Sequence, residues 1–586
     1  MGTREGLAKL EAGDLAGAEA EFLPVLFANP KDVPALHGLA RVAMGARRFD
    51  VATDLLGQAK KLEPASERLA LDFLEACSAL ASQQPGNASV HYALAQGFLE
   101  LGDIEAARDA LVASLMADPR HVQARWLVNR LLPRVCGNPQ EIALWRRRTA
   151  TGIAILDATV HPASPEASAL ELPGLLARTN FDLAYQGQDD RQFQEIYGRL
   201  VHRAMTAWLP DLAEPLLPVP FVFREDKRIR IGFASAHFTR HTVFMFLSGW
   251  IRHLDKSRFK VFCYLVNATP DDWTQEIAGA CDEFRHLQCA LEDSARNIRA
   301  DALDVLIYPD VGMDARSFAL AAIRLAPVQM AGMGHPVTTG LPSIDIFLSG
   351  ELLETEASET HYSEKLVRLP GISVCYHPLQ TQQTKQRADF GLDGADTIYL
   401  CCQPHQKYLP QSDGVFTEIA GLVPQAKFLF FDHPARHYDN YRFKARLRQA
   451  FLARGLDPAR HLIFMPRQAW EDFIQLYGLC DVFLDSFGWS GGNTSFEALS
   501  RSLPIVTLPA PLMRGRQSFA MLKILGLDEC IARDALDYVK IAVRLGTDQD
   551  WNRHIRGRIA QERGKLFDDL TPVRALEAVV AQAVVG

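Results

Sequence analysis

The chain has 586 residues, which is too long for one hydrophobic core and predicts about three or four domains. Its 48% hydrophobic and 23% charged residues are typical of globular proteins, and its net charge of -8 argues against a dedicated nucleic-acid binder. No run of about 18 apolar residues occurs, and charged residues stand where a signal peptide needs its apolar region, so we expect a cytoplasmic location without membrane insertion.

Residues 1–135 show a recurring helical pattern. A spacing of 34 residues occurs three times: Ala18 to Ala52, Pro30 to Pro64 and Pro85 to Pro119. A small residue where two helices cross, a large apolar residue four positions later and a proline that ends the helix are what a tetratricopeptide repeat requires. We therefore expect an array of such repeats, capped by a helix over 122–132, that offers a groove to a protein partner. A structural spacer or a dimerisation surface is the alternative.

Residues 136–222 are expected to form a helical linker region. The stretch H-P-A-S-P at His161–Pro165 interrupts the helical pattern and predicts a hinge. The proline-rich segment Leu209–Phe221 predicts a domain boundary, because proline lacks a backbone donor and disrupts helices.

Two series of short apolar segments, separated by helical windows, follow this boundary. The first, in residues 223–380, predicts strands Arg230–Ala234, Lys260–Val266, Val305–Tyr308, Val328–Met333 and Ile344–Leu348. The second, in residues 381–586, predicts strands Thr397–Cys401, Lys427–Phe431, Leu462–Met465, Asp481–Leu484 and Ile505–Leu508. Buried strands that alternate with helices indicate parallel, helix-covered sheets. We expect two Rossmann-like α/β lobes, with a cleft onto which the carboxyl ends of the strands open.

The turn after the fourth strand of the second series carries the strongest local signal for a ligand site. It contains Gly491 and Gly492, and a helix is predicted to begin at Asn493 or Thr494. Glycines let the backbone approach a ligand closely, and the free N–H groups of a helix N-terminus favour an anion such as a diphosphate. One turn further, the carboxylate of Glu497 is suited to accept ribose hydroxyl groups. An ordinary βα turn is the alternative.

Three further loops that follow predicted strands carry groups suited to catalysis. They contain His241 in S-A-H-F-T-R-H-T, His335 in G-H-P-V-T-T-G and Lys407 in Q-P-H-Q-K-Y-L-P. A histidine at this edge is placed to act as a base or to hold a hydroxyl or phosphate, and a lysine is placed to neutralise a leaving diphosphate. Each of these groups alone is more often a surface or turn residue. All of them would converge on one cleft.

On these residues the chain resembles the family 41 glycosyltransferases, which include O-GlcNAc transferase, its bacterial homologues and the bacterial N-glucosyltransferases. The family motif D-F-G-x-H is matched by H-F-T-R-H and falls on His241, and R-P-A-P-x-Q is matched by R-L-A-P-V-Q with Arg324 and Gln329. The loop G-[YH]-P-x-T-[ST] is matched at Gly334–Thr339. The lysine of K-x-x-P falls on Lys407.

This resemblance implies a GT-B catalytic region with an acceptor lobe at 223–380 and a nucleotide-sugar lobe at 381–586. It implies catalytic roles for His241, His335 and Lys407. The residues implied in nucleotide-sugar binding are Arg324, Gln329, Lys407, Arg467, Gly492, Asn493, Thr494 and Glu497. Whether His241 is the general base or positions the acceptor is left open, since an α-phosphate oxygen of the donor is also able to take the proton.

The implied reaction is inverting transfer of a sugar, GlcNAc or glucose, from a UDP-sugar to a Ser/Thr or Asn side chain. The acceptor would be a protein recruited by the repeats, such as flagellin or an adhesin. No metal or other cofactor is expected, since the ten cysteines form no C-x-x-C pair and no D-x-D pair stands in a candidate loop. The sequence G-N-T at 492–494 replaces the H-T-T of O-GlcNAc transferases, whereas the repeats favour that group, so the donor sugar and acceptor atom stay open.

Two alternatives remain at this stage. A flagellin glycosyltransferase of similar architecture would use a nonulosonic acid carried on CMP. A binding scaffold would hold a nucleotide sugar or a partner without turnover. Nucleotide preference distinguishes the first alternative from the UDP-sugar enzyme, and binding without transfer identifies the second.

Overall fold

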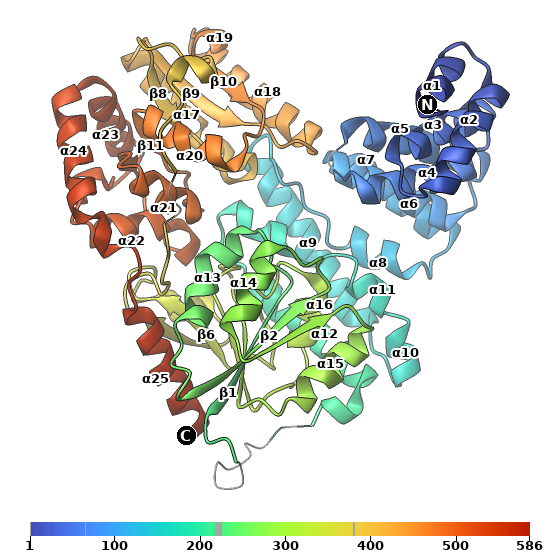
Figure 1. Ribbon diagram of the computed structural model, residues 1–586, viewed down its shortest axis with the longest axis horizontal. Helices are drawn as coiled ribbons and strands as arrows, with labels where there is room; N and C mark the ends of the chain where they lie inside the picture. The colour runs from blue at the N-terminus through green and yellow to red at the C-terminus, as the bar shows by residue number, and fades with distance from the viewer. Residues whose placement is uncertain (1, 65, 215, 217–224, 379–380, 586) are drawn as a thin grey trace. The chain divides into compact units, whose positions relative to one another are not determined.

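A computed structural model of the chain describes residues 2–64, 66–214, 216, 225–378 and 381–585 (Figure 1). The chain divides into two compact units. The first comprises Met1–Val135 with Asp432–Lys444, and the second comprises Cys136–Phe431 with Ala445–Gly586.

The first unit is helical, and its packing follows the 34-residue pattern. Its helices are α1 Gly2–Glu11, α2 Leu15–Ala28, α3 Val33–Gly45, α4 Phe49–Leu62, α5 Glu67–Gln83, α6 Ala88–Leu101, α7 Ile104–Ala117 and α8 Val122–Val128. The small and large apolar residues of the pattern, Ala18 with Phe22 and Ala52 with Leu56, are fully buried. Each proline of the pattern is the second residue after a helix, because it cannot continue that helix. The expected array of helical repeats is therefore present.

A helical segment opens the second unit. Its elements are α9 Pro139–Thr159, α10 Pro165–Ala169, α11 Leu172–Leu175, the 3₁₀ helix η1 Phe181–Gln186 and α12 Arg191–Trp208. The predicted hinge coincides with the break between α9 and α10. Of the predicted boundary Leu209–Phe221, residues 215 and 217–221 lie outside the described residues.

The N lobe, as we call residues 225–378, is built on a parallel sheet. In its described part the sheet has seven strands in the order β3-β2-β1-β4-β5-β6-β7. They are β1 Ile229–Ser235, β2 Phe259–Val266, β3 Glu283–Leu287, β4 Val305–Tyr308, β5 Val328–Ala331, β6 Ile346–Gly350 and β7 Lys365–Leu369. Helices α13 Thr242–Arg252, α14 Asp272–Ala280, α15 Leu291–Ala300 and α16 Ala315–Ala321 connect the strands. The strand order reverses between β1 and β4.

The C lobe, as we call residues 381–570, repeats this design. Its described residues form a five-stranded parallel sheet in the order β10-β9-β8-β11-β12. The strands are β8 Thr397–Leu400, β9 Ala426–Phe431, β10 Leu462–Met465, β11 Val482–Leu484 and β12 Ile505–Val506. The helices are α17 Asp413–Leu422, α18 His437–Ala453, α19 Pro458–His461, α20 Trp470–Leu479, α21 Asn493–Ser500, α22 Gln517–Ile524, α23 Ala535–Thr547 and α24 Gln549–Glu562. Its order reverses between β8 and β11.

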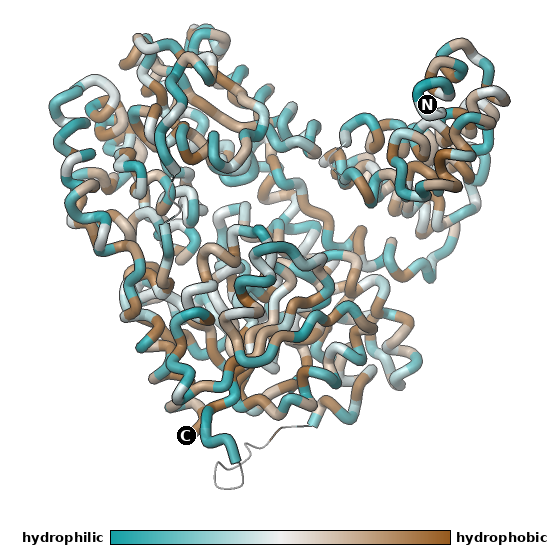
Figure 2. Tube along the Cα trace, in the orientation of Figure 1, coloured by the Kyte–Doolittle hydropathy of each residue, from teal (hydrophilic) through white to brown (hydrophobic). Residues whose placement is uncertain are grey.

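The strands that the sequence predicts are all present within about two residues at each end, and two more strands were missed. The missed strands, β3 and β7, are the two edges of the N-lobe sheet. Their sequences, E-F-R-H-L and K-L-V-R-L, carry the charged side chains that edge strands tolerate, so they lack a continuous apolar run. The hydrophobic stretches in Figure 2 run through the inner strands of both sheets, where the cores lie.

The last helix, α25 Thr571–Val585, returns to the N lobe (Figure 1). The carboxylate of Glu577 is 2% exposed and accepts a hydrogen bond from the backbone N–H of Asp255 at 2.8 Å. The chain therefore ends on the N lobe after completing the C lobe.

Candidate active site

Three of the predicted site loops lie where the strand order of a sheet reverses, and the fourth, which carries His335, follows β5, the strand next to β4. In the N lobe, His241 follows β1 and caps α13. In the C lobe, Lys407 follows β8, and the glycine loop, which we define as Ser490–Gly492, follows β11. Two loops that diverge from neighbouring strands leave a crevice at such a point, and α/β proteins bind ligands there. The two lobes belong to one compact unit.

Lys407 is partly buried beside the glycine loop. Its Nζ donates to Oε1 of Gln403 at 3.0 Å and to the backbone carbonyl of Ser490 at 3.2 Å. It also lies 5.0 Å from the ring centre of Trp489. Burial lowers the pKa of Lys407 to about 8, against an opposing effect of the nearby Asp485 carboxylate. A buried amine that stays largely protonated near neutral pH is suited to bind a phosphate anion.

The glycine loop places the N-terminus of α21 close to Lys407. A Cβ atom on Gly491 would lie 2.3 Å from Oγ of Ser495 and 2.7 Å from Nε2 of Gln403, so a side chain here would displace polar groups that line the loop. Gln403 in turn donates to Oγ1 of Thr494 at 2.6 Å. Helix α21 begins at Asn493, as predicted, and no side chain caps its first turn. Its free N–H groups therefore favour an anion.

Glu497 lies on the buried face of α21. Its Oε2 accepts a hydrogen bond from the hydroxyl of Tyr477 at 3.0 Å, and the residue is 7% exposed. Burial raises the pKa of Glu497 to about 7, although the Tyr477 hydroxyl lowers it. The carboxylate is thus held in place one turn from the anion-binding end, where a ribose would follow a diphosphate.

The two lobes meet at the N-termini of two helices. Nδ1 of His241 accepts the backbone N–H of Val243 at 3.2 Å and so caps α13. The next residue, Thr242, accepts a hydrogen bond through its carbonyl from Nδ2 of Asn493 at 2.8 Å. His241 therefore lies next to the start of α21. Burial, followed by the neighbouring His237, lowers the pKa of His241 to about 4, so this imidazole is neutral at pH 7.

His335 lies deeper than a surface loop residue would. It is 2% exposed, and its ring lies 5.0 Å from that of Phe181 on η1. Burial lowers its pKa to about 3, and among the described residues its Nδ1 has no hydrogen-bond partner. The two threonines of the same loop bind the buried carboxylate of Glu364. They fix the loop and do not cap a helix.

Arg324 and Gln329 lie at the amino edge of the N-lobe sheet, where the parallel strands begin. Arg324 precedes β5 and makes a two-pronged ion pair with Asp345, at 2.6 and 3.0 Å. Gln329 is fully buried and bonds the backbone of Ile323, Leu325 and Ser343. The structure does not bring these two residues to the carboxyl edge, and their bonds favour a part in the fold. Of the other sequence-predicted residues, Arg467 is exposed in the loop after β10.

The helical segment contributes directly to the surroundings of Lys407. Tyr185 of η1 stacks on Trp489 with ring centres 4.5 Å apart, and Phe181 lies 6.1 Å from the same ring. The segment therefore packs within the second compact unit, against the loop beside Lys407.

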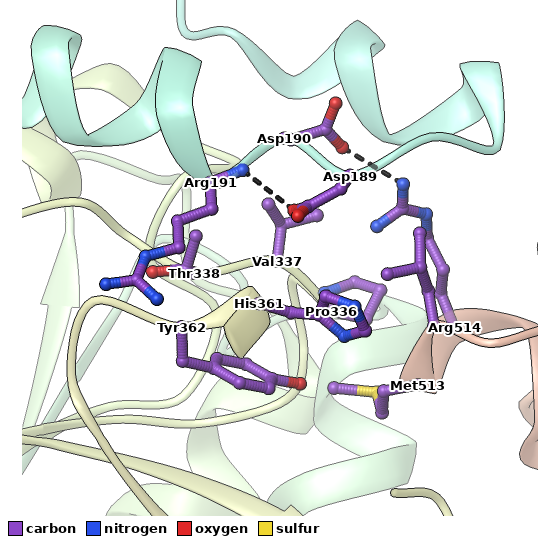
Figure 3. A pocket seen from close by; sticks show the side chains of 11 residues that line it. Asp189, Asp190, Arg191, Pro336, Val337, Thr338, His361, Tyr362, Met513 and Arg514 are labelled. Carbon is purple, nitrogen blue, oxygen red and sulfur yellow. Dashed lines mark hydrogen bonds and ion pairs between the residues drawn. The ribbon is translucent and has the colours of Figure 1, made fainter. Parts of the chain in front are cut away.

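Beside this aromatic cluster lies a small pocket (Figure 3). It is lined by Asp189, Asp190, Arg191, Pro336, Val337, Thr338, His361, Tyr362, Leu512, Met513 and Arg514. In Figure 3 Asp190 reaches toward Arg514 of the C lobe, and the pair is 3.0 Å apart. The second carboxylate oxygen of Asp190 lies 2.8 Å from Arg146 of α9. Buried charges thus join the helical segment to the C lobe.

Sequence reasoning missed several residues that complete the site. Gln403 and Asp310 lie within three residues of the ends of β8 and β4, so the rule that found Lys407 and His241 would also have found them. Asp485 is buried after β11, where its carboxylate accepts from the N–H of Gly491 at 2.8 Å and the hydroxyl of Thr507 at 2.7 Å. Burial raises the pKa of Asp485 to about 6. Trp489 carried no separate sequence signal.

The described residues contain no group of three or more His, Cys, Asp or Glu side chains arranged to hold a metal ion. Within the same residues, no helix is both long enough and apolar enough to cross a membrane.

Two Rossmann-like lobes, with their reversal points meeting at a helix N-terminus, define the GT-B architecture of nucleotide-sugar enzymes. The sequence profile of glycosyl transferase family 41 matches residues 218–377 and 378–571. The chain belongs to this family.

Comparisons with individual proteins agree with this family assignment. The probable UDP-N-acetylglucosamine–peptide N-acetylglucosaminyltransferase SPINDLY of Petunia hybrida is 26% identical over 329 residues, which cover 55% of this chain and 35% of that protein. The probable enzyme SEC of Arabidopsis thaliana, with the same transferase name, is 27% identical over 387 residues, covering 63% and 38%. The chain thus spans little more than a third of the length of these relatives. A mutant O-GlcNAc transferase of Thermobaculum terrenum shares the fold, with a TM-score of 0.61, 22% identity and coverage of 100% and 96%.

Proposed function

We propose that the chain is an inverting protein glycosyltransferase that transfers a sugar, GlcNAc or glucose, from a UDP-sugar to a protein side chain. Membership of family 41 and the transferase names of the plant relatives support this reaction. The single observation that carries it is the partly buried amine of Lys407, held by Gln403 and the Ser490 carbonyl beside the uncapped start of α21. That arrangement is an anion site built for a leaving diphosphate.

In this proposal the C lobe binds the donor. Glu497 accepts the ribose hydroxyl groups, and Lys407 with the first N–H groups of α21 holds the diphosphate. As the acceptor oxygen or nitrogen forms a bond to the anomeric carbon, the bond from that carbon to the β-phosphate oxygen breaks and UDP leaves with the electron pair. Positive charge from Lys407 and the helix N-terminus stabilises the departing diphosphate, so we propose that transfer proceeds without a metal ion.

The N lobe would present the acceptor side. His241 uses Nδ1 to accept a backbone N–H, so in the neutral ring its Nε2 carries the proton and acts as a hydrogen-bond donor. We propose that this donor orients a substrate oxygen next to the start of α21. The helical repeats would recruit the protein that carries the acceptor side chain, and the acceptor is a Ser/Thr hydroxyl or an Asn amide.

The first test is calorimetric titration with UDP and with CMP, each with and without Mg²⁺, followed by assay of transfer from UDP-GlcNAc and UDP-glucose to protein and peptide acceptors. We expect metal-independent UDP binding that Glu497→Ala weakens at least tenfold, since it removes a charged hydrogen-bond acceptor. Glu471→Ala, at an exposed position of the first turn of α20, is the control and should bind as wild type. Preference for CMP would indicate the nonulosonic acid enzyme, and binding without transfer would indicate a scaffold.

A further inference from the structure

Two histidine rings lie against each other in the loop between β1 and α13. The ring centres of His237 and His241 are 4.3 Å apart, with 33° between the ring planes. Both residues are only partly exposed. The two rings differ in what their Nδ1 atoms bind, and this difference decides which of them is able to accept a proton.

Nδ1 of His237 faces a carboxylate. It is hydrogen-bonded to Oδ2 of Asp310, which follows β4 and is 2% exposed. An ionised carboxylate only accepts hydrogen bonds, so it fixes the proton of His237 on Nδ1 and leaves the lone pair on Nε2. A buried carboxylate that orients an imidazole in this way is the arrangement by which hydrolytic enzymes prepare a histidine base. The backbone N–H of His237, bonded to Oγ of Ser235 at 2.8 Å, also holds the loop.

Nδ1 of His241 has the opposite role. It accepts the N–H of Val243 at 3.2 Å, which requires the lone pair on Nδ1 and places the proton on Nε2. In that form Nε2 of His241 donates and has no lone pair for an incoming proton. His241 would have to give up the cap of α13 before it could act as a base.

We propose that His237 is the catalytic base of this enzyme, that Asp310 is the positioning residue that orients it, and that His241 is a hydrogen-bond donor beside it. This inference rests on the proposed function, because it assigns the proton transfer of that reaction. Adjacency supports it: Thr242, which follows His241, bonds Asn493 at the start of α21, so the histidine pair borders the place where the diphosphate is expected.

The O–H or N–H proton of the acceptor passes to Nε2 of His237 while the acceptor atom bonds to the anomeric carbon. The bond to the β-phosphate oxygen breaks, and UDP takes its electron pair. His237 becomes an imidazolium next to the Asp310 carboxylate, which stabilises it, and the proton is released to water when the products leave.

The charges around the two rings fit these roles. Burial lowers the pKa of His237, but the hydrogen bond and charge of Asp310, together with the charge of Asp314 at the start of α16, outweigh burial and raise its pKa above the ordinary 6.5. The pKa of His241 is lowered to about 4 by burial and by His237, with Asp310 opposing. A base is most effective when its pKa lies near the working pH, which favours His237.

One experiment tests the geometry without any turnover. Long-range ¹H–¹⁵N spectra of the full chain with ¹⁵N-labelled histidine report the tautomer and pKa of each ring, and His237→Gln and His241→Gln assign the signals. We expect His237 to be protonated on Nδ1 with a pKa above 6.5, and His241 to be the Nε2–H tautomer that stays neutral to below pH 6. Exchanged tautomers would overturn the assignment whatever the activity.

The second experiment is the pH dependence of kcat. The base must be unprotonated, so the rate should fall as pH drops through the pKa of His237. His237→Gln should remove this acid limb and lower the plateau about 100-fold or more, whereas His241→Gln should keep the limb. Asp310→Asn should move the limb to lower pH and reduce the plateau at least tenfold, and Asp314→Asn, which loses charge but no bond to His237, should do much less.

A His237→Gln enzyme that keeps both the plateau and the acid limb would overturn the proposal and assign the proton to a phosphate oxygen of the donor. If wild type transferred no sugar while its histidines showed the expected tautomers, the proposed function would fall and the Asp310–His237 geometry would stand.

Discussion

Lys407 and Glu497 show at the scale of single residues how burial prepares a site. Burial lowers the pKa of the Lys407 amine to about 8 and raises the pKa of the Glu497 carboxyl to about 7. Both pKa values therefore lie closer to neutral pH than they would in water. Each group is less stable in its charged form than it would be in water. A bound ligand would offset this loss of stability by supplying an anion to the lysine and hydroxyl donors to the glutamate.

Replacing Lys407 by alanine should abolish most of the transfer activity. Loss of a preorganised charge that stabilises the leaving group lowers kcat by about 100-fold or more, and initial rates with saturating donor measure it. Lys523→Ala removes an amine at an exposed position of the C lobe and should leave the rate unchanged. Near wild-type activity of the Lys407→Ala enzyme, with an unchanged melting temperature, would remove this residue from the mechanism.

Glu497→Gln should stabilise the ligand-free protein at high pH. Because burial raises the pKa of Glu497 from 4.5 to about 7, its contribution to folding stability is complete below pH 4.5 and is lost as pH rises through 7. At about 1.4 kcal/mol per pKa unit, the loss is on the order of 3 kcal/mol. A neutral glutamine keeps an acceptor for the Tyr477 hydroxyl and escapes this loss.

Thermal unfolding without ligand at pH 5 and pH 8 measures the effect. We expect the variant to melt higher than wild type at pH 8 and equally at pH 5. An identical difference at both pH values would show that ionisation of Glu497 is not its cause.

At the scale of elements, the helical segment before the N lobe is joined to the C lobe by buried charges. Asp190, just before α12, lies between Arg146 of α9 and Arg514, which precedes α22. The backbone carbonyl of Arg514 accepts the N–H of Ser490, the residue whose own carbonyl binds Lys407. A helical segment about 300 residues away in sequence therefore supports the loop that binds Lys407.

Asp190→Asn should strongly destabilise the second unit. The substitution leaves two buried guanidinium groups without their shared counter-charge, and breaking a buried ion pair on one side costs about 3–5 kcal/mol. Its neighbour Asp189 is exposed, so Asp189→Asn is a matched control that should change stability by no more than about 0.5 kcal/mol. Urea unfolding followed by tryptophan fluorescence compares the two. Equal midpoints would show that the charge of Asp190 contributes little.

At the scale of the whole molecule, the repeats and most of the two α/β lobes form separate compact units. Segment Asp432–Lys444 of the C-lobe sequence belongs to the unit of the repeats, where His437 lies 3.3 Å from Glu67. Deleting residues 1–135 would remove the helices that this segment packs with. Substitution in the full chain is therefore the cleaner way to test what the repeats do.

In the described part of the repeats, Phe27 and Met116 are the most exposed large apolar residues, with exposed fractions of 86% and 81%. If the repeats recruit the acceptor protein, a Phe27→Ser, Met116→Ser double variant should lower modification of a folded protein about tenfold, the effect of losing roughly 1.4 kcal/mol of contact energy. Transfer to a short peptide and UDP binding should not change. Leu536→Ser, at a 71% exposed position of α23, is the control. Undiminished modification would make these positions irrelevant to recruitment.

The sequence by itself predicted most of the elements and their order, apart from the edge strands β3 and β7. The 34-residue period, the helix-ending prolines, the apolar strands and the glycine loop before α21 depend on interactions between near neighbours in the chain, and such patterns can be read locally. The same rule placed His241, Lys407 and the start of α21 at the carboxyl edges of strands.

Only the tertiary structure decided which side chains are partners. Arg324 pairs with Asp345 at the amino edge of the sheet, and His335 is buried against Phe181. The helical segment belongs to the same compact unit as the two lobes. The tertiary structure also paired His237 with Asp310, 73 residues away, and left His241 as a helix cap. Burial and hydrogen-bond partners depend on contacts between distant parts of the chain, and they set the tautomers and pKa values from which the chemistry follows.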